Sequence, residues 1–81
     1  MDRILAIISD WDPIGLFPGA PKDEYLNEAK EIESILTNNP QITWQELANC
    51  IHNVFIIAFG VGTLEVKMEE CFEIAKKILS N

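Results

Sequence analysis

The sequence predicts an all-α fold: a compact four-helix bundle-like domain with an ordered Pro/Gly-containing loop between helices 1 and 2. Three observations lead to this fold class. Apolar side chains recur at three- and four-residue spacing along four segments, no segment alternates apolar and polar residues for long, and proline and glycine gather between the first two segments. The length of 81 residues leaves room for a single helical domain, residues 1–81.

The first two helices are predicted over residues 2–9 and 22–37. Each carries an apolar stripe at helical spacing, formed by Ile4, Leu5 and Ile8 on the first and by Tyr25, Ala29, Ile32 and Leu36 on the second. Pro21 suits the first position of the second helix, and Asp23 and Glu24 suit the positive end of its dipole. The segment Asn38-Asn39-Pro40 is expected to end this helix.

The third helix is predicted over residues 44–59, with Thr43 as its N-cap and Glu46 completing a capping box. It is apolar on two sides, so we expect it either to be the central helix or to line a dimer interface. Two glycines then break this helix. The fourth helix, capped by Thr63, is predicted to extend to about Leu79.

The segment between the first two helices, residues 10–25, is predicted to be an ordered loop. It contains three prolines and two glycines, but also four large apolar side chains that a flexible linker would lack. The run Asp12-Pro13-Ile14-Gly15 fits a type I turn. Trp11 is expected to pack on the core with its indole N–H on a carbonyl, and Tyr25 is expected to pack beside it.

The same loop holds the candidate binding residues. Its carboxylates would suit Mg²⁺, Mn²⁺ or Ca²⁺ if the loop brought them together, although their spacing matches no EF-hand. No catalytic residue, metal-ligand set or cofactor site is assigned. The residues with a hypothetical binding role are Asp10, Trp11, Asp12, Pro13, Gly15, Asp23, Glu24 and Tyr25.

Negative charge is the clearest global feature. Thirteen acidic residues oppose six basic ones, which gives a formal net charge of −7 and a pI near 4.4. Nucleic acid and anionic membranes are therefore excluded as partners, whereas basic proteins and metal cations fit. Two acidic rows at helical spacing are either solvated faces or partner-binding faces: Glu24, Glu28 and Glu31, and Glu65, Glu69 and Glu73.

The two cysteines and the single histidine show no catalytic pattern. Cys50 and Cys71 fall among apolar residues on predicted helices, where a thiol packs as a small hydrophobe without forming a disulfide. His52 points about 200° away from Cys50 on a helix, so the two cannot act as a pair. Because the first apolar run is too short for a secretory signal and no run could span a bilayer, we expect a cytoplasmic protein.

Two motifs carry a resemblance to a known family. The run Trp11-Asp12-Pro13-Ile14-Gly15 is followed by Ala20-Pro21-Lys22-Asp23-Glu24-Tyr25 and then by Glu28. This combination resembles the small bacterial domain-of-unknown-function family 1871, with its W-D-P-[IL]-G loop and P-x-D-E-Y helix start. The resemblance implies a small, helical, single-domain cytoplasmic protein, and it implies no activity, cofactor or catalytic residue.

Three functional hypotheses follow. The first is a non-catalytic protein–protein interaction or regulatory module, similar to immunity or antitoxin proteins, that binds a basic partner through its acidic surface. The alternative is a divalent-metal-binding protein or metal-dependent enzyme that uses the carboxylates around the 10–24 loop. The third is a homodimer formed through the third helix, with Asn49, His52 and Asn53 at or beside the interface.

Overall fold

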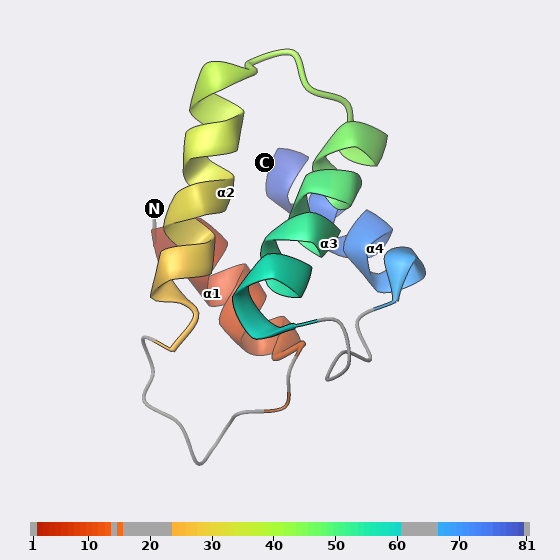
Figure 1. The fold of residues 1–81 in the computed structure, drawn as a ribbon. Coiled ribbons are helices and arrows are strands. Elements are labelled where there is room, and N and C mark those ends of the chain that lie inside the picture. The colour runs from red at the N-terminus through yellow and green to blue at the C-terminus, as the bar shows by residue number, and fades with distance from the viewer. Residues whose placement is uncertain (1, 14, 16–23, 61–66, 81) are drawn as a thin grey trace.

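The computed structural model describes residues 2–13, 15, 24–60 and 67–80. It contains four helices: α1 (Asp2–Trp11), α2 (Leu26–Asn38), α3 (Trp44–Phe59) and α4 (Met68–Leu79) (Figure 1). The described residues contain no strand. The all-α class and the four-helix bundle-like arrangement are therefore confirmed.

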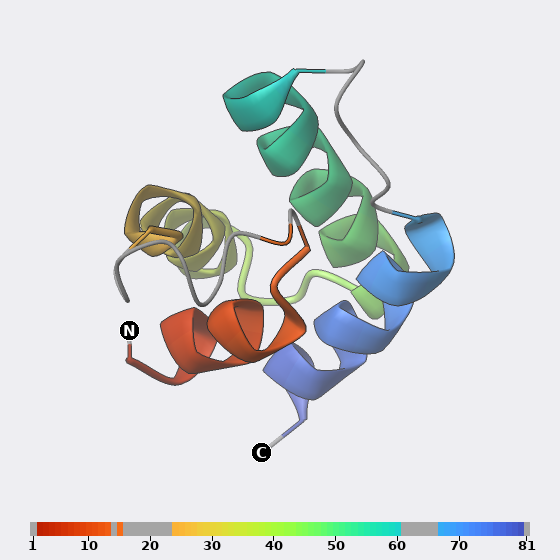
Figure 2. The same ribbon diagram turned by 90° about the horizontal axis from the view of Figure 1, so that it is seen from below.

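The four helices form a closed ring. Helix α3 packs against α2 and α4, and α1 packs against the same two helices from the other side. The view from below shows α1 opposite α3 and α2 opposite α4 (Figure 2). Helix α3 contributes the most buried side chains of the four and packs most extensively against α4, but it is a member of the ring and is not surrounded by the other three helices.

The core fills the inside of this ring and is apolar throughout the described residues, with no buried polar or charged residue among them. The predicted stripes of the first two helices face this core, although Leu5 and Leu36 are only partly buried. The buried side chains are Ile4, Ile8, Tyr25, Ala29, Ile32, Leu47, Ala48, Ile51, Val54, Phe55, Cys71, Ile74, Ala75 and Ile78. The second apolar side of α3 faces outward in part, since the Ile57 side chain is 80% exposed.

Helix α3 has the predicted bounds because its N-terminus is specified locally. The Glu46 N–H donates to Thr43 Oγ1 at 3.2 Å, and the Thr43 N–H donates to Glu46 Oε1 at 2.9 Å. These two bonds form the predicted capping box and satisfy two N–H groups at the helix start.

Helices α1 and α2 differ from their predicted bounds. Helix α1 continues to Trp11, two residues further than predicted, and the next N–H, that of Asp12, still donates to the Ile8 carbonyl at 2.9 Å. Helix α2 begins at Leu26, because Glu24 and Tyr25 form a turn and Tyr25 occupies the N-cap. The predicted roles of Pro21 and Asp23 at the helix start lie outside the described residues.

Helix α4 begins at Met68, with Lys67 as its N-cap, and it ends at Leu79 as predicted. The predicted Thr63 cap and Glu65 lie outside the described residues.

The guanidinium of Arg3 donates to the backbone carbonyls of Lys77, Ile78 and Ser80, at 2.7 Å for Ile78. These carbonyls lack partners within the helix, and a cation complements the negative end of its dipole, so Arg3 ties α1 to the end of α4.

Each helix in the described part of the chain is too short or too polar to cross a lipid bilayer. This finding agrees with the sequence, in which the longest run of apolar residues and glycine, residues 54–62, is nine residues long.

Candidate functional site

The two ends of the 10–25 loop meet on the side of α3 that faces the core. The Trp11 ring meets the Phe55 ring edge-on, with centroids 5.6 Å apart and an interplanar angle of 81°. The Tyr25 ring also meets Phe55 edge-on at 6.0 Å, and Phe59 stacks on Phe55 at 5.9 Å. We call Trp11, Tyr25, Phe55 and Phe59 the aromatic cluster. It brings Trp11 and Tyr25 together, as the sequence predicted, and Phe55 joins them.

A short hydrogen bond links the loop ends directly. The Tyr25 hydroxyl donates to Asp12 Oδ1 at 2.6 Å, and the Tyr25 side chain is fully buried while Asp12 is half-buried. A bond from a phenol to a carboxylate is charge-assisted and stronger than a neutral one. Asp12 is therefore committed to a structural contact, which we call the Asp12–Tyr25 clamp.

The backbone at Asp12 reverses the chain after α1. Asp12 has a φ of 49°, in the left-handed region that aspartate and asparagine tolerate better than most residues. The Gly15 N–H donates to the Asp12 carbonyl at 3.1 Å, which is the bond that the predicted turn requires. Gly15 itself has a φ of 74°, so a side chain at this position would be strained.

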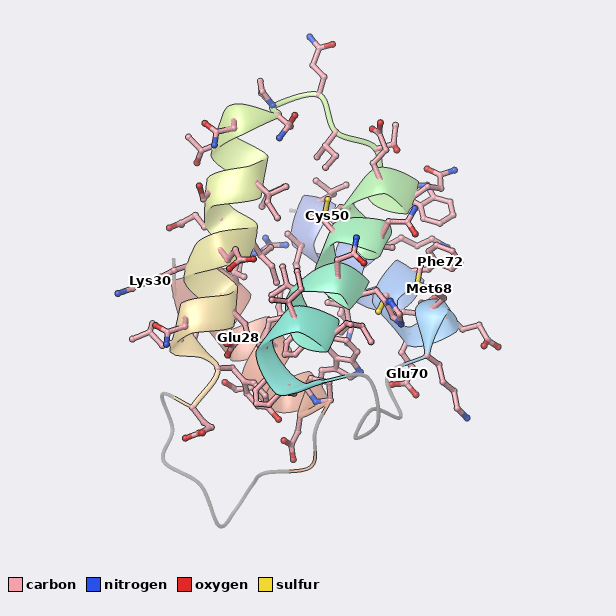
Figure 3. All side chains as sticks on the ribbon, viewed as in Figure 1. Glu28, Lys30, Cys50, Met68, Glu70 and Phe72 are labelled. Atoms are coloured by element: carbon pink, nitrogen blue, oxygen red, sulfur yellow. The ribbon has the colours of Figure 1, made fainter. Side chains whose placement is uncertain are left out.

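Trp11 has a polar partner that the sequence did not reveal. Its indole N–H donates to Glu70 Oε1 at 3.0 Å, and not to a backbone carbonyl as expected. Glu70 lies on the first turn of α4 (Figure 3), 59 positions further along the chain. The contact can be found only once the fold places α4 beside α1, because local sequence patterns carry no information on such a pair.

The loop carboxylates that the structure describes do not converge on one site. Asp10 and Glu24 are exposed on different elements, Asp12 is held by Tyr25, and Asp23 lies outside the described residues. The parts of the chain that the structure describes contain no group of three or more His, Cys, Asp or Glu residues that could hold a metal ion. Of the remaining candidate residues, Pro13 is half-buried in the turn.

Two hollows open on the surface of the described residues. One groove, of about 330 Å³, lies beside the Trp11–Glu70 contact and is lined by Trp11, Glu69, Glu70, Glu73, Ile74 and Lys77. A larger hollow of about 600 Å³ lies where α2 passes into α3 and is lined by Asn38, Asn39, Pro40, Gln41, Ile42, Glu46 and Cys50. The groove forms between α1 and α4, which are distant in sequence, whereas the larger hollow is lined by residues 38–50, which are neighbours along the chain.

Glu28 departs from the exposed position that both interpretations of its acidic row, a solvated face or a partner-binding face, would give it. It is half-buried on α2, on the side that lies against α1 (Figure 3), and its Oε1 is buried without a hydrogen-bond partner among the described residues. Burial raises the pKa of this carboxyl above its usual value, and the neighbouring charges of Glu31 and Glu24 raise it further. The Ser9 hydroxyl on α1 is a second buried oxygen without a partner among the described residues.

The thiols behave as the sequence predicted. Both cysteines are free, with Cys50 half-buried and Cys71 buried. Burial, together with the negative charge of Glu70, raises the pKa of the Cys71 thiol to about 11. The thiol is therefore protonated at neutral pH and packs as a small apolar group, without the reactivity of a thiolate.

The described residues form a small all-α fold in which Asp12 of the W-D-P run and Tyr25 of the D-E-Y run are joined by a hydrogen bond. The sequence matches the family described as Domain of unknown function (DUF1871) over residues 3–80. The chain belongs to this family, so the resemblance that its motifs carried is confirmed. No curated protein and no solved structure matches it.

Proposed function

We propose that the protein is a non-catalytic protein–protein interaction module of a regulatory kind, comparable to an immunity or antitoxin protein, and that it binds a basic protein. The proposal includes a single domain and a cytoplasmic location. The observation that carries it is the distribution of charge. The chain has a net charge of −7, no acidic residue is buried in the described core, and the exposed carboxylates include Glu24, Glu31, Glu69, Glu70 and Glu73.

The state of the reactive side chains supports a non-catalytic role. Asp12 accepts a hydrogen bond from a buried tyrosine, and the Cys71 thiol is buried and protonated. Neither group is placed to attack a substrate or to transfer a proton at a surface cleft. The polar contacts described at the two loop ends are thus explained by the fold, which leaves recognition to the exposed surface.

The acidic surface also predicts how the partner would bind. Complementary charge accelerates encounter and selects against acidic competitors more than it raises final affinity. Because the carboxylates are exposed, their attraction for a basic surface is screened over about 10 Å at 0.1 M salt. Binding should therefore weaken steeply as the salt concentration rises.

The test is affinity capture from a lysate of the source organism, followed by reconstitution of each captured complex from two purified proteins. The proposal expects a stoichiometric basic partner that binds at about 50 mM salt and dissociates by about 500 mM, because the Debye length falls over this range. Calorimetry on the purified pair at both concentrations gives the affinities. A reconstituted partner that is acidic, or whose affinity is unchanged by salt, would contradict the proposal.

A further inference from the structure

The groove beside Trp11 combines an apolar floor with a charged rim. The half-buried Trp11 and the buried Ile74 form the floor, and the side chains of Glu69, Glu70, Glu73 and Lys77 stand around it. Exposed apolar surface that is enclosed by polar groups is typical of a protein interaction site. Tryptophan is also among the residues that contribute most to binding when they lie at the centre of such a site.

The rim of the groove is negatively charged and therefore attracts cationic side chains. Three carboxylates and one ammonium group give the lining a formal charge of −2. Glu69 and Glu73 lie four positions apart on α4, where like charges repel by a few tenths of a kcal/mol. Lys76 lies 3.8 Å from Glu73, but both side chains are mostly exposed, so a partner could displace this ion pair at little cost.

The indole ring of Trp11 is held in one orientation from two sides. Its N–H is fixed by Glu70 at 3.0 Å, and its ring meets Phe55 edge-on at 5.6 Å. A side chain that is already ordered loses little conformational freedom when a partner covers it. The groove thus presents a preorganised aromatic surface next to carboxylates, which is the combination that attracts lysine and arginine side chains through their apolar stems and their charged ends.

We propose that the groove lined by Trp11, Glu69, Glu70, Glu73, Ile74 and Lys77 is the docking site for a basic amphipathic segment of the partner protein. The proposal rests on the proposed function, because it assigns a place and a chemistry to the binding of a basic protein. The apolar side chains of the segment cover Trp11 and Ile74, and its lysines or arginines meet Glu69 and Glu73. Charge complementarity selects a cationic segment over an acidic or neutral one.

The two tryptophans provide a direct readout. Trp11 lies in the groove, whereas Trp44 lies at the start of α3, where Lys76 sits over its ring at 4.5 Å. Their indole N–H signals can be followed separately by NMR in one titration. The probe is a synthetic helical peptide of leucine and lysine with an apolar face, added at about 25 mM salt to limit screening. Peptides with glutamate in place of lysine, and with the same residues in scrambled order, are the controls.

The expected result is a saturable shift of the Trp11 indole signal and of the backbone amides of residues 69–77, with a smaller shift at Trp44. The scrambled peptide should bind several-fold more weakly, because it cannot present an apolar face to the groove. Equal shifts across the acidic surfaces of α2 and α4, or no shift at Trp11 at saturating peptide, would overturn the groove as the docking site.

Charge-matched variants separate the groove from general electrostatic attraction. Glu69→Gln combined with Glu73→Gln should lower peptide affinity about tenfold, as expected for the loss of two partly desolvated charge contacts. Glu24→Gln combined with Glu31→Gln removes the same charge on the α2 side of the ring and should change affinity less than about twofold. Equal losses in the two double variants would overturn the proposal.

The two proposals fail in distinguishable ways. If the natural basic partner binds in a salt-dependent manner but its affinity is unaffected by the groove variants, the docking site is wrong and the function as a binding module stands. If reconstituted partners bind without salt dependence, the proposed function is wrong whatever the peptide does.

A Trp11→Phe variant, which retains a ring on Phe55 and loses the N–H to Glu70, should weaken peptide binding several-fold while the domain remains folded.

Discussion

The loop ends and the first turns of α4 contain similar residue types and use them in opposite ways. At the loop ends, Trp11 and Tyr25 pack against Phe55, and Asp12 accepts a hydrogen bond from the Tyr25 hydroxyl at 2.6 Å. On α4, Glu69, Glu70 and Glu73 are exposed, and one of them reaches back to Trp11. The difference is that Asp12 and Tyr25 are engaged in contacts within the fold, whereas the glutamates of α4 remain exposed and line the proposed docking groove.

The largest expected effect is at the centre of the aromatic cluster. Phe55→Ala should lower the free energy of unfolding by about 3–5 kcal/mol, because it leaves a cavity between Trp11, Tyr25 and Phe59. A domain of this size has a stability on the order of 5 kcal/mol, so the variant should be largely unfolded at 37 °C. Urea denaturation followed by circular dichroism measures the loss. A loss below about 1 kcal/mol would show that the cluster does not hold the loop.

The Asp12–Tyr25 clamp gives the next effect. Tyr25→Phe should cost about 1–2 kcal/mol, since it removes the hydroxyl and leaves a half-buried carboxylate without that donor. Asp12→Asn is the matched control, because its amide oxygen still accepts the bond and asparagine tolerates the left-handed backbone. Chemical denaturation of both variants gives the two values. A larger loss in Asp12→Asn than in Tyr25→Phe would contradict the assigned roles.

Glu28 should give the domain a small pH dependence of stability. Its folded pKa is raised, so the folded state binds more protons than the unfolded state above the usual glutamate value of 4.5, and stability falls as the pH rises through this range. Glu28→Gln should reduce that fall, by less than about 1 kcal/mol because water screens the half-exposed side chain. Urea denaturation of both proteins between about pH 4.5 and 7.5 measures it. Parallel stability curves would refute the effect.

The smallest effect on stability is expected on α4. Glu69→Gln with Glu73→Gln should leave the urea midpoint almost unchanged, because both side chains are exposed and the relief of their repulsion offsets the loss of the Glu69 charge from the positive end of the helix dipole. The same variant is expected to lose peptide affinity, so stability and binding separate at this position. A clear drop in the urea midpoint would show that Glu69 and Glu73 stabilise the fold, as Asp12 and Tyr25 are expected to do.

The sequence predicted the parts of the fold that local chemistry determines. Helix α3 has its predicted bounds because Thr43 and Glu46 form their capping box within four residues. The apolar stripe of α2 is correct at Ala29 and Ile32, which are fully buried. In contrast, α2 starts later than the proline and acidic residues suggested, because Tyr25 is drawn into the core and held by Asp12, and this tertiary contact overrides the local signals.

The candidate site was predicted only in part, and for a related reason. The proximity of Trp11 and Tyr25 followed from their apolar character, but the partner of the Trp11 indole, Glu70, is distant in sequence and belongs to neither of the two acidic rows that the sequence pattern singled out. Glu28 shows the same limitation, since helical periodicity placed it on an outer face and the packing of α1 covers one of its oxygens. Pairings between elements decide such contacts, and a single sequence does not specify them.

Stability and peptide affinity can be measured on the same three proteins: the wild type, Tyr25→Phe, and Glu69→Gln with Glu73→Gln. Tyr25→Phe is expected to lose stability and to retain affinity under conditions where it remains folded. The double glutamine variant is expected to retain stability and to lose affinity about tenfold. The reverse pattern, with affinity lost in folded Tyr25→Phe and retained in the α4 variant, would contradict the central claim by placing binding at the loop.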